Sequence, residues 1–393
     1  MSDVSLSYPA RLPVGVAPEV SGLASRWHTV LAVAFLGYTF IGLHPFEETS
    51  VAGRADGSLA DRVVVIGMFF LALRLMWAQR LAVWQSVLAS WPLFLLICFA
   101  GASILWSDYP GLTLRRTALL VFLTAIAMAI GLGIKDIRRF HTFLFVAMTG
   151  VILFNLAGTV VAPSKSITDI GVKGVYTQKN VAGIVAMITA ILGMTWTFGA
   201  KSRRQVLIAL AALVPTLLFL VLTRSKTSIN LTVVGLAVVL FFALAERAGE
   251  RFILASGALG MVALAILISV LIAIDFDVDT ALGHLVGDST FSGRDELWAF
   301  TRREAERRFW FGHGYGAYWD VGRLNDPLVK VEPGTWLGSV EIGIINQAHH
   351  GYLELWLHVG WPATVPATVF VIYASVRGAY VAVLGQGPVE VRA

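Results

Sequence analysis

Long apolar stretches separated by short polar segments dominate this chain of 393 residues. A helix needs about 20 mostly apolar residues to cross the hydrocarbon layer of a membrane. Stretches of this kind predict about ten spans, over residues 28–45, 62–78, 86–106, 113–133, 140–162, 180–199, 204–223, 227–245, 252–275 and 353–376. The pattern therefore predicts an all-α, polytopic helical membrane protein.

Composition supports this prediction. Hydrophobic residues make up 57% of the chain and charged residues only 14%, too little charge to cover soluble domains of the same total length. The net charge of +5 is modest and reports mainly on membrane-protein loops, so nucleic-acid binding is not indicated. The single cysteine, Cys98, excludes an intrachain disulfide and a metal site built from several thiolates.

Lysine and arginine in the short loops predict the orientation of the spans. One set of alternate loops carries basic residues at or near Arg80, Lys135, Lys201 and Arg247, and we assign these loops to the cytoplasm. By this count both termini are cytoplasmic as well. The predicted order is a cytoplasmic tail (1–26), a bundle of about nine spans (27–275), a large loop (276–350), a last span (351–378) and a short cytoplasmic tail (379–393). The large loop then faces outward, into the periplasm of a Gram-negative cell.

Several basic residues lie on the outward side, where the charge rule does not expect them: Arg115, Arg116, Lys165, Lys173, Lys179, Arg224 and Lys226. A phosphate-bearing ligand at that face is one explanation for their presence. Snorkelling of long side chains at helix ends is the alternative.

The large loop is too long to lack structure of its own. Ser292 and Asp295 predict a capped helix, and apolar and charged residues then alternate at near-helical spacing. Such a helix lies on a membrane surface or packs across the mouth of a bundle. The glycines of the following segment, residues 312–316, come after a helix and not a strand, so they predict a tight turn and not a dinucleotide-binding loop.

Two adjacent histidines, His349 and His350, stand where the loop returns to the membrane. Histidine titrates near neutral pH and can accept a proton from a hydroxyl group. Glu354 follows His350 by four residues and can reach it along a helix. Zinc binding is the competing interpretation, but no third ligand has convincing spacing.

These segments together resemble the O-antigen ligase and polymerase superfamily, and within it the exopolysaccharide polymerisation proteins of the ExoQ type. The segments that carry the resemblance are Trp106–Pro110, Gln178–Asn180, Thr223–Thr227, Ser292–Arg294 with Trp298, Gly312–Gly316 with Trp319, and Ala348–Leu353. Their order and spacing match over most of the chain. The sequence departs from the family pattern at His350, where asparagine is usual, at Lys226, where arginine is usual, and at Ala363.

The resemblance implies a GT-C-like, metal-independent glycosyltransferase with no cofactor, whose donor is a glycan on undecaprenyl diphosphate. It implies catalytic roles for His349, Arg294 and His350. We expect diphosphate binding by Arg224, Lys226, Lys179 and Arg115, and glycan contact or structural support from Trp298, Tyr315, Trp319 and Glu354. The expected partners are a growing polysaccharide acceptor, a flippase and a chain-length regulator.

Three alternatives remain open at this stage. A ligase that transfers the same glycan to a lipid A core differs from a polymerase only in its acceptor. A transporter would place ionisable residues within the spans, whose interiors are nearly free of charge here. A glycosidase would use Asp295, Glu296 or Glu354, but the first two are neighbours on one predicted helix and do not face one cleft.

Overall fold

The computed structural model describes residues 22–46, 58–249, 294–322, 325–331, 334–340 and 345–384, together with residues 252, 255–256, 259–260 and 262. The regular secondary structure of the described part is helical apart from one short antiparallel hairpin, β1 (Ile167–Thr168) and β2 (Gly171–Val172), in which Ile167 pairs with Val172. An all-α fold is therefore confirmed. The predicted span 252–275 and the two predicted tails lie almost entirely outside the described residues.

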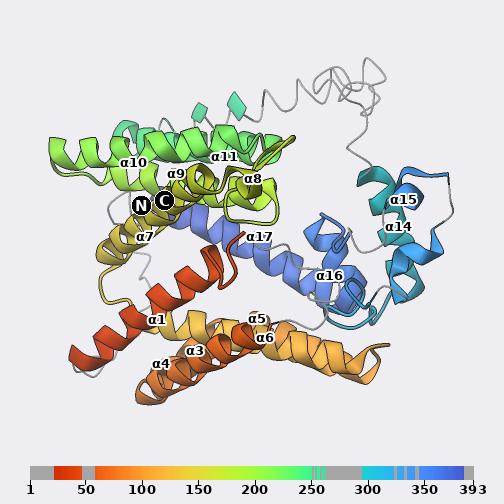
Figure 1. Ribbon diagram of the computed structural model, residues 1–393. Coiled ribbons are helices and arrows are strands. Elements are labelled where there is room, and N and C mark those ends of the chain that lie inside the picture. Colours follow the sequence, from red (N-terminus) through yellow and green to blue (C-terminus); the bar gives the residue numbers. More distant parts are fainter. Residues whose placement is uncertain are drawn as a thin grey trace.

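Two groups of helices form the bundle (Figure 1). The first group comprises α1 (Gly22–Phe40), α3 (Leu59–Ala78), α4 (Arg80–Ala89), α5 (Trp91–Ala102), the 3-10 turn η1 (Ser103–Leu105) and α6 (Pro110–Leu132). The second comprises α7 (Ile137–Val161), α8 (Pro163–Ser166), α9 (Lys179–Phe198), α10 (Arg203–Leu222) and α11 (Lys226–Ala248). Helix α17 (Trp361–Leu384) packs on α5 and α11 and so joins the groups.

The remaining elements fold beside the bundle, on the right of the view in Figure 1. They are α14 (Arg294–Arg307), the 3-10 turn η3 (Pro327–Lys330), α15 (Trp336–Ser339) and α16 (Gly351–Val359). Leu297, Phe300, Trp319, Leu337 and Leu357 are buried together in a core of this polar segment. The predicted loop is thus a folded unit over its described residues.

Five described helices are long and apolar enough to span a membrane: α6, α7, α9, α10 and α11. Helices α4 and α5 form a sixth if that bent pair is one span. Helices α1, α3 and α17 coincide with three further predicted spans but fall short of the same measure. The polytopic character is confirmed, and the count of about ten remains a prediction.

Two predicted spans are divided in the structure. Span 86–106 breaks at Ser90, where α4 and α5 meet at 86°, because Pro92 can begin a helix but cannot continue one. Span 353–376 breaks at Gly360, whose φ of 74° ends α16 before α17 begins. A Cβ atom at Gly360 would collide with the carbonyl of Trp310, so this break requires glycine. Helix α16 therefore belongs to the core of the polar segment and is not the start of a continuous span.

Each group of helices has its own apolar core. Met148, Ile152 and Phe219 are buried where α7, α9 and α10 meet, whereas Leu31 and Ile126 are buried between α1, α3 and α6. Helix α9 turns a row of small residues towards its neighbours: Ala182, Gly183, Ala186, Ala190 and Gly193. Small residues let membrane helices approach closely, which explains the central position of α9 in its group.

One buried amide anchors the segment between α7 and α9. The side chain of Asn155 is fully buried, and its Oδ1 accepts a hydrogen bond from the backbone N–H of Val175 (3.0 Å). Its Nδ2 donates to the hydroxyl of Tyr176 (3.3 Å), which in turn donates to the carbonyl of Phe40 (2.6 Å). A polar side chain in an apolar core thus fixes the turn that precedes Lys179.

We predict that Asn155→Leu lowers the free energy of unfolding by about 1–3 kcal/mol, because it leaves a buried N–H without its acceptor. Thermal unfolding in detergent measures this change. Thr149→Ala is the matched control on the same helix, since its hydroxyl bonds only the carbonyl of Phe145. Equal stability of the two variants would contradict the anchoring role.

Candidate active site

The predicted site residues gather at one end of the bundle. Beyond α1, the N–H of Phe46 donates to the carbonyl of Val175 (3.0 Å), which joins that end of the first group to the turn before α9. Arg116, near the start of α6, donates to the carbonyl of Trp319 (3.0 Å) and so joins the same end to the polar segment. The opposite end carries the basic residues of the predicted cytoplasmic loops, among them Arg139 and Lys201.

His349 lies in a turn that two side chains hold in place. The backbone N–H of Ala348 donates to Oε2 of Glu354 (2.6 Å), and its carbonyl accepts from Nε1 of Trp298 (2.9 Å). His349 follows with a φ of 54°, in the left-handed region that non-glycine residues rarely adopt, and it is exposed. A residue held in such a conformation needs surrounding structure to keep it there, and strain of this kind is frequent at functional sites.

His350 is the N-cap residue of α16, and its catalytic role stays a prediction. Its Nδ1 accepts a hydrogen bond from the N–H of Leu353 (3.2 Å) and caps α16, and its ring makes a T-shaped contact with Trp298, with 5.4 Å between the ring centroids. Glu354, expected to reach His350, instead bonds the backbone at Ala348. His350 has an extended backbone (φ −144°, ψ 101°), so its side chain turns to the N–H of Leu353, while only its carbonyl bonds Glu354, accepting the N–H of that residue (2.8 Å).

Burial shapes the charge of Glu354 and His358. Burial raises the pKa of Glu354, while the hydrogen bond from the Ala348 N–H and the nearby indole N–H of Trp319 lower it. Burial lowers the pKa of His358 to about 3, with Arg116 and His313 adding repulsion. Its Nε2 lies 3.4 Å from Oε1 of Glu354. A neutral imidazole thus faces this carboxyl group, and the contact is not an ion pair at neutral pH.

Arg294 is the first residue of α14, and its side chain lies outside the described part, as does Ser292, the predicted cap. The helix is amphipathic as predicted. Its buried face packs on α16 and on Trp319, so this face belongs to the core of the polar segment. Glu296, one of the glycosidase candidates, accepts the N–H of Leu337 (3.0 Å) and supports α15.

The glycine segment forms the predicted tight turn. Gly312, Gly314 and Gly316 all have positive φ, of 65°, 99° and 66°. A Cβ at Gly312 would lie 2.5 Å from the carbonyl carbon of His358, and one at Gly316 would lie 2.6 Å from Cδ of Arg116. The turn is wedged between α16 and α6, so the glycines serve close approach as well as conformation.

Residues 106–110, one of the family-like segments, form the bundle's side of this contact. Trp106 Nε1 donates to the carbonyl of Phe311 (2.7 Å), and Arg308 pairs with Asp108 (2.7 Å). The side chain of Ser107 lies so close to Gly314 that a Cβ atom there would collide with it. Its hydroxyl accepts a hydrogen bond from the hydroxyl of Thr113 (2.7 Å). Two motifs about 200 residues apart in the sequence are therefore one interface.

The aromatic candidates differ in exposure. Trp319 is 2% exposed, in the core of the polar segment, so its ring offers no face to a sugar. Tyr315 is half-buried against α5 and α16, and its N–H donates to Ser103 Oγ (2.9 Å). Trp298 is half-buried beside His349. Of the three, Trp298 has the position best suited to contact a glycan.

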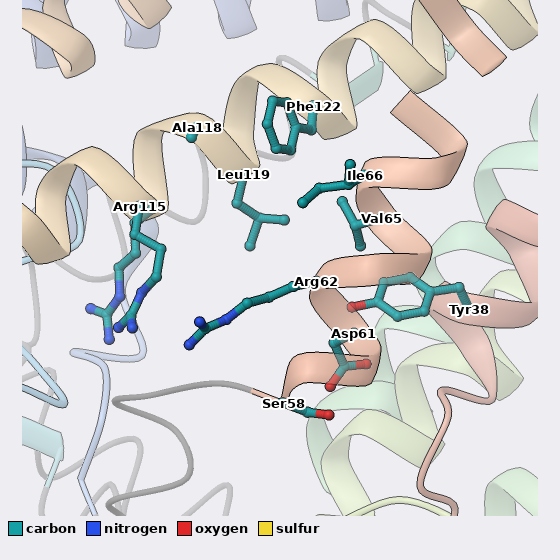
Figure 2. Close-up of a pocket in the computed structure, with 11 residues that line it drawn as sticks. Tyr38, Ser58, Asp61, Arg62, Val65, Ile66, Arg115, Ala118, Leu119 and Phe122 are labelled. Atoms are coloured by element: carbon teal, nitrogen blue, oxygen red, sulfur yellow. The ribbon is translucent and has the colours of Figure 1, made fainter. Parts of the chain in front are cut away.

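The basic candidates separate into two places. Lys179, at the start of α9, donates through Nζ to the carbonyls of Ile170 (2.9 Å) and Arg224 (3.4 Å). Arg224 has a φ of 50° in the turn between α10 and α11, and both it and Lys226 are exposed there. Arg115 instead lines a pocket between α1, α3 and α6, shown in Figure 2. We call the first group, Lys179, Arg224 and Lys226, the α9–α11 cluster.

Sequence reasoning missed two residues that the structure makes prominent. Arg116 was noted only as a basic residue on the outward side, yet it holds the carbonyls of Gly316 and Trp319. Arg62 fell inside a predicted span, yet it lines the same pocket as Arg115. The available signal for Arg62 was its position at the outward start of a predicted span, a position that Arg115 and Arg116 share.

We predict that Glu354→Ala lowers stability by about 1–3 kcal/mol and strongly reduces activity, because the Ala348 N–H loses its acceptor. Glu354→Gln keeps an acceptor oxygen and serves as the matched variant. The raised pKa of Glu354 means that the folded state disfavours ionisation, so wild-type stability falls as pH rises from the ordinary glutamate pKa to the raised one. The unfolding temperature of Glu354→Gln should therefore rise relative to that of wild type as the pH increases over that range. A constant difference from acid to neutral pH would contradict this environment.

Comparison with known proteins now adds to this geometry. Residues 211–368 match the family model described as O-antigen ligase. The match contains Arg224, Lys226, Arg294 and His349, but not Lys179 or Arg115. Comparison with curated proteins finds no match. The chain is therefore a multi-pass membrane protein that carries, over residues 211–368, an O-antigen ligase domain of the O-antigen ligase and polymerase superfamily.

Proposed function

We propose that this protein polymerises oligosaccharide repeat units carried on undecaprenyl diphosphate, at the outer face of the bacterial inner membrane. The coarser activity, that of a ligase or polymerase acting on lipid-linked glycan, follows from the family. The observation that carries the proposal is His349, exposed and held in a left-handed turn by Glu354 and Trp298. Basic residues at the same end of the bundle supply the charge that a diphosphate requires.

In the proposed reaction the acceptor hydroxyl oxygen attacks the anomeric carbon of the donor glycan. The bond between that carbon and the phosphate oxygen breaks, and undecaprenyl diphosphate leaves with the bonding electrons. His349 accepts the hydroxyl proton and releases it to solvent. Arg294, Arg224 and Lys226 stabilise the leaving diphosphate, so fixed side-chain charge takes the place that a metal ion occupies in other phosphate chemistry.

Four further candidates support this scheme. Lys179 orients the turn of Arg224 through its carbonyl, and Glu354 and Trp298 orient His349. His350 caps the helix on which that turn rests. The proposed partners are the lipid-linked glycan, the growing polysaccharide, a flippase that delivers repeats and a chain-length regulator.

The second candidate function is ligation of the same glycan to a lipid A core. It is favoured by the description of the matching family, O-antigen ligase. The resemblance of Gln178–Asn180 and Thr223–Thr227 to the exopolysaccharide type favours polymerisation. The acceptor is the whole difference between the two reactions.

We predict that His349→Ala and Arg294→Ala each reduce polymer formation at least about 100-fold, because each removes a group that acts on the reacting atoms. Incorporation of labelled repeats by purified protein measures the effect. His350→Asn is the control: asparagine also caps helices well, so this variant should keep both folding and activity. Wild-type polymer from His349→Ala would refute the assignment of the base.

We predict that purified protein given lipid-linked repeats alone produces a ladder of longer lipid-linked glycans. Adding lipid A core should leave that ladder unchanged. A product that forms only when lipid A core is present, with no ladder in its absence, would establish the ligase instead.

A further inference from the structure

We propose that the pocket between α1, α3 and α6 binds the phosphate group and adjoining chain of a second polyprenyl-phosphate lipid, apart from the donor at the α9–α11 cluster. This inference rests on the proposed function, in which two lipid-linked glycans must meet. The pocket is defined by Tyr38, Arg62, Arg115, Arg116, Leu119 and Phe122, and its volume is about 450 Å³. We call it the α3–α6 pocket.

One end of the α3–α6 pocket is positively charged. Figure 2 shows the side chains of Arg62, from α3, and Arg115, from α6, extending towards the same space. Arg116 lies beside them and lines the pocket as well. Guanidinium groups that converge from two helices form the arrangement that proteins commonly use to bind phosphate through paired hydrogen bonds.

Two carboxylates of the described residues lie near these arginines. Asp61 lies next to Arg62 in the chain, but its carboxylate is on the side of Tyr38, whose hydroxyl hydrogen-bonds it (Figure 2). Asp320 lies close enough to Arg116 to interact with its charge.

The other end of the pocket is apolar and open to the side. Val65, Ile66, Leu119 and Phe122 form its wall, above the arginines in Figure 2. Ile66 and Leu119 are 40% and 43% exposed, on helices that run through the bundle. In a membrane this exposed surface meets lipid chains. A charged head with an apolar, laterally open wall fits an amphiphile better than a free anion.

The charged end adjoins the proposed reaction site. Arg116 bonds the carbonyls of Gly316 and Trp319 in the polar segment. Arg115 also borders a shallow depression formed with Asp108 and Asp320. A glycan attached to a phosphate in the α3–α6 pocket would therefore emerge beside the glycine turn, on the side of the bundle that carries the polar segment.

The pocket and the α9–α11 cluster lie on different helix groups. The pocket is lined by α1, α3 and α6, whereas Lys179, Arg224 and Lys226 belong to α9, α11 and the turn between α10 and α11. A lipid held in the pocket and a lipid held at the cluster would therefore contact different side chains. Two separate basic sites on different helix groups match a reaction between two lipid-linked chains.

Native mass spectrometry of the purified full chain tests this proposal with three probes: undecaprenyl phosphate, phosphatidylglycerol and inorganic diphosphate. We expect wild type to bind two molecules of undecaprenyl phosphate. The double variant Arg62→Ala, Arg115→Ala should bind one lipid with wild-type affinity, and its affinity for the second lipid should fall at least about tenfold. Leu119→Trp, which fills the apolar wall and removes no charge, should have the same effect. Lys201→Ala combined with Arg204→Ala, at the opposite end, is the matched control and should bind two.

Retention of two lipids with wild-type affinity by both pocket variants would overturn the proposal. It would also be overturned if phosphatidylglycerol competed equally, since the occupant would be a bilayer phospholipid, or if inorganic diphosphate bound as tightly as the lipid. Unfolding temperatures of all variants identify any loss that reflects misfolding, and Leu119→Trp keeps the test valid if the double arginine variant is unstable.

The same measurement separates this inference from the proposed function. His349→Ala should bind two lipids and form no polymer. If His349→Ala formed polymer while the pocket variants still lost one lipid, the proposed chemistry would fail and the second lipid site would stand. The reverse pattern would remove the second site and leave the chemistry intact.

Discussion

The polar segment is held on the membrane bundle by arginines that bind backbone carbonyls. Arg116 bonds the carbonyls of Gly316 and Trp319, and Arg308 bonds the carbonyl of Trp106 while pairing with Asp108. These carbonyls belong to tight turns that cannot pair within a helix or sheet, and a buried polar group without a partner costs about 1–3 kcal/mol. The position of every other group in the segment depends on this attachment, because the glycine turn fixes both the end of α16 and the face of α14.

From that attachment a chain of contacts leads to His349. The glycine turn packs against the end of α16 at His358. Helix α16 carries Glu354, whose carboxylate binds the backbone of Ala348, and α14 supplies Trp298 to the same residue. The unusual backbone of His349 is thus supported from two helices that share one core. A loop histidine without this support would have no fixed direction, and a general base needs one.

The sequence alone predicted the helices, the amphipathic face of α14 and the tight glycine turn, because these depend on local spacing and on residues with special backbone freedom. It did not predict which side chains contact one another. The hydrogen bond of Glu354 to Ala348 and the burial of Trp319 follow from how α14, α16 and the turn pack, which no local pattern contains. The break at Gly360 had a visible cause, glycine followed by Pro362, but a continuous apolar run concealed it.

From the sequence alone, the basic residues on the outward side could either bind a phosphate-bearing ligand or snorkel to the membrane surface. Their contacts divide them. Arg116 and Lys179 donate to carbonyls and hold turns in place. The exposed residues Arg224 and Lys226 stand at one helix group, and Arg62 and Arg115 at the other. Snorkelling would scatter cations around the rim of the bundle. Arg62 and Arg115 instead line one apolar-walled pocket from two different helices, an arrangement that suits the phosphate and chain of the proposed second lipid.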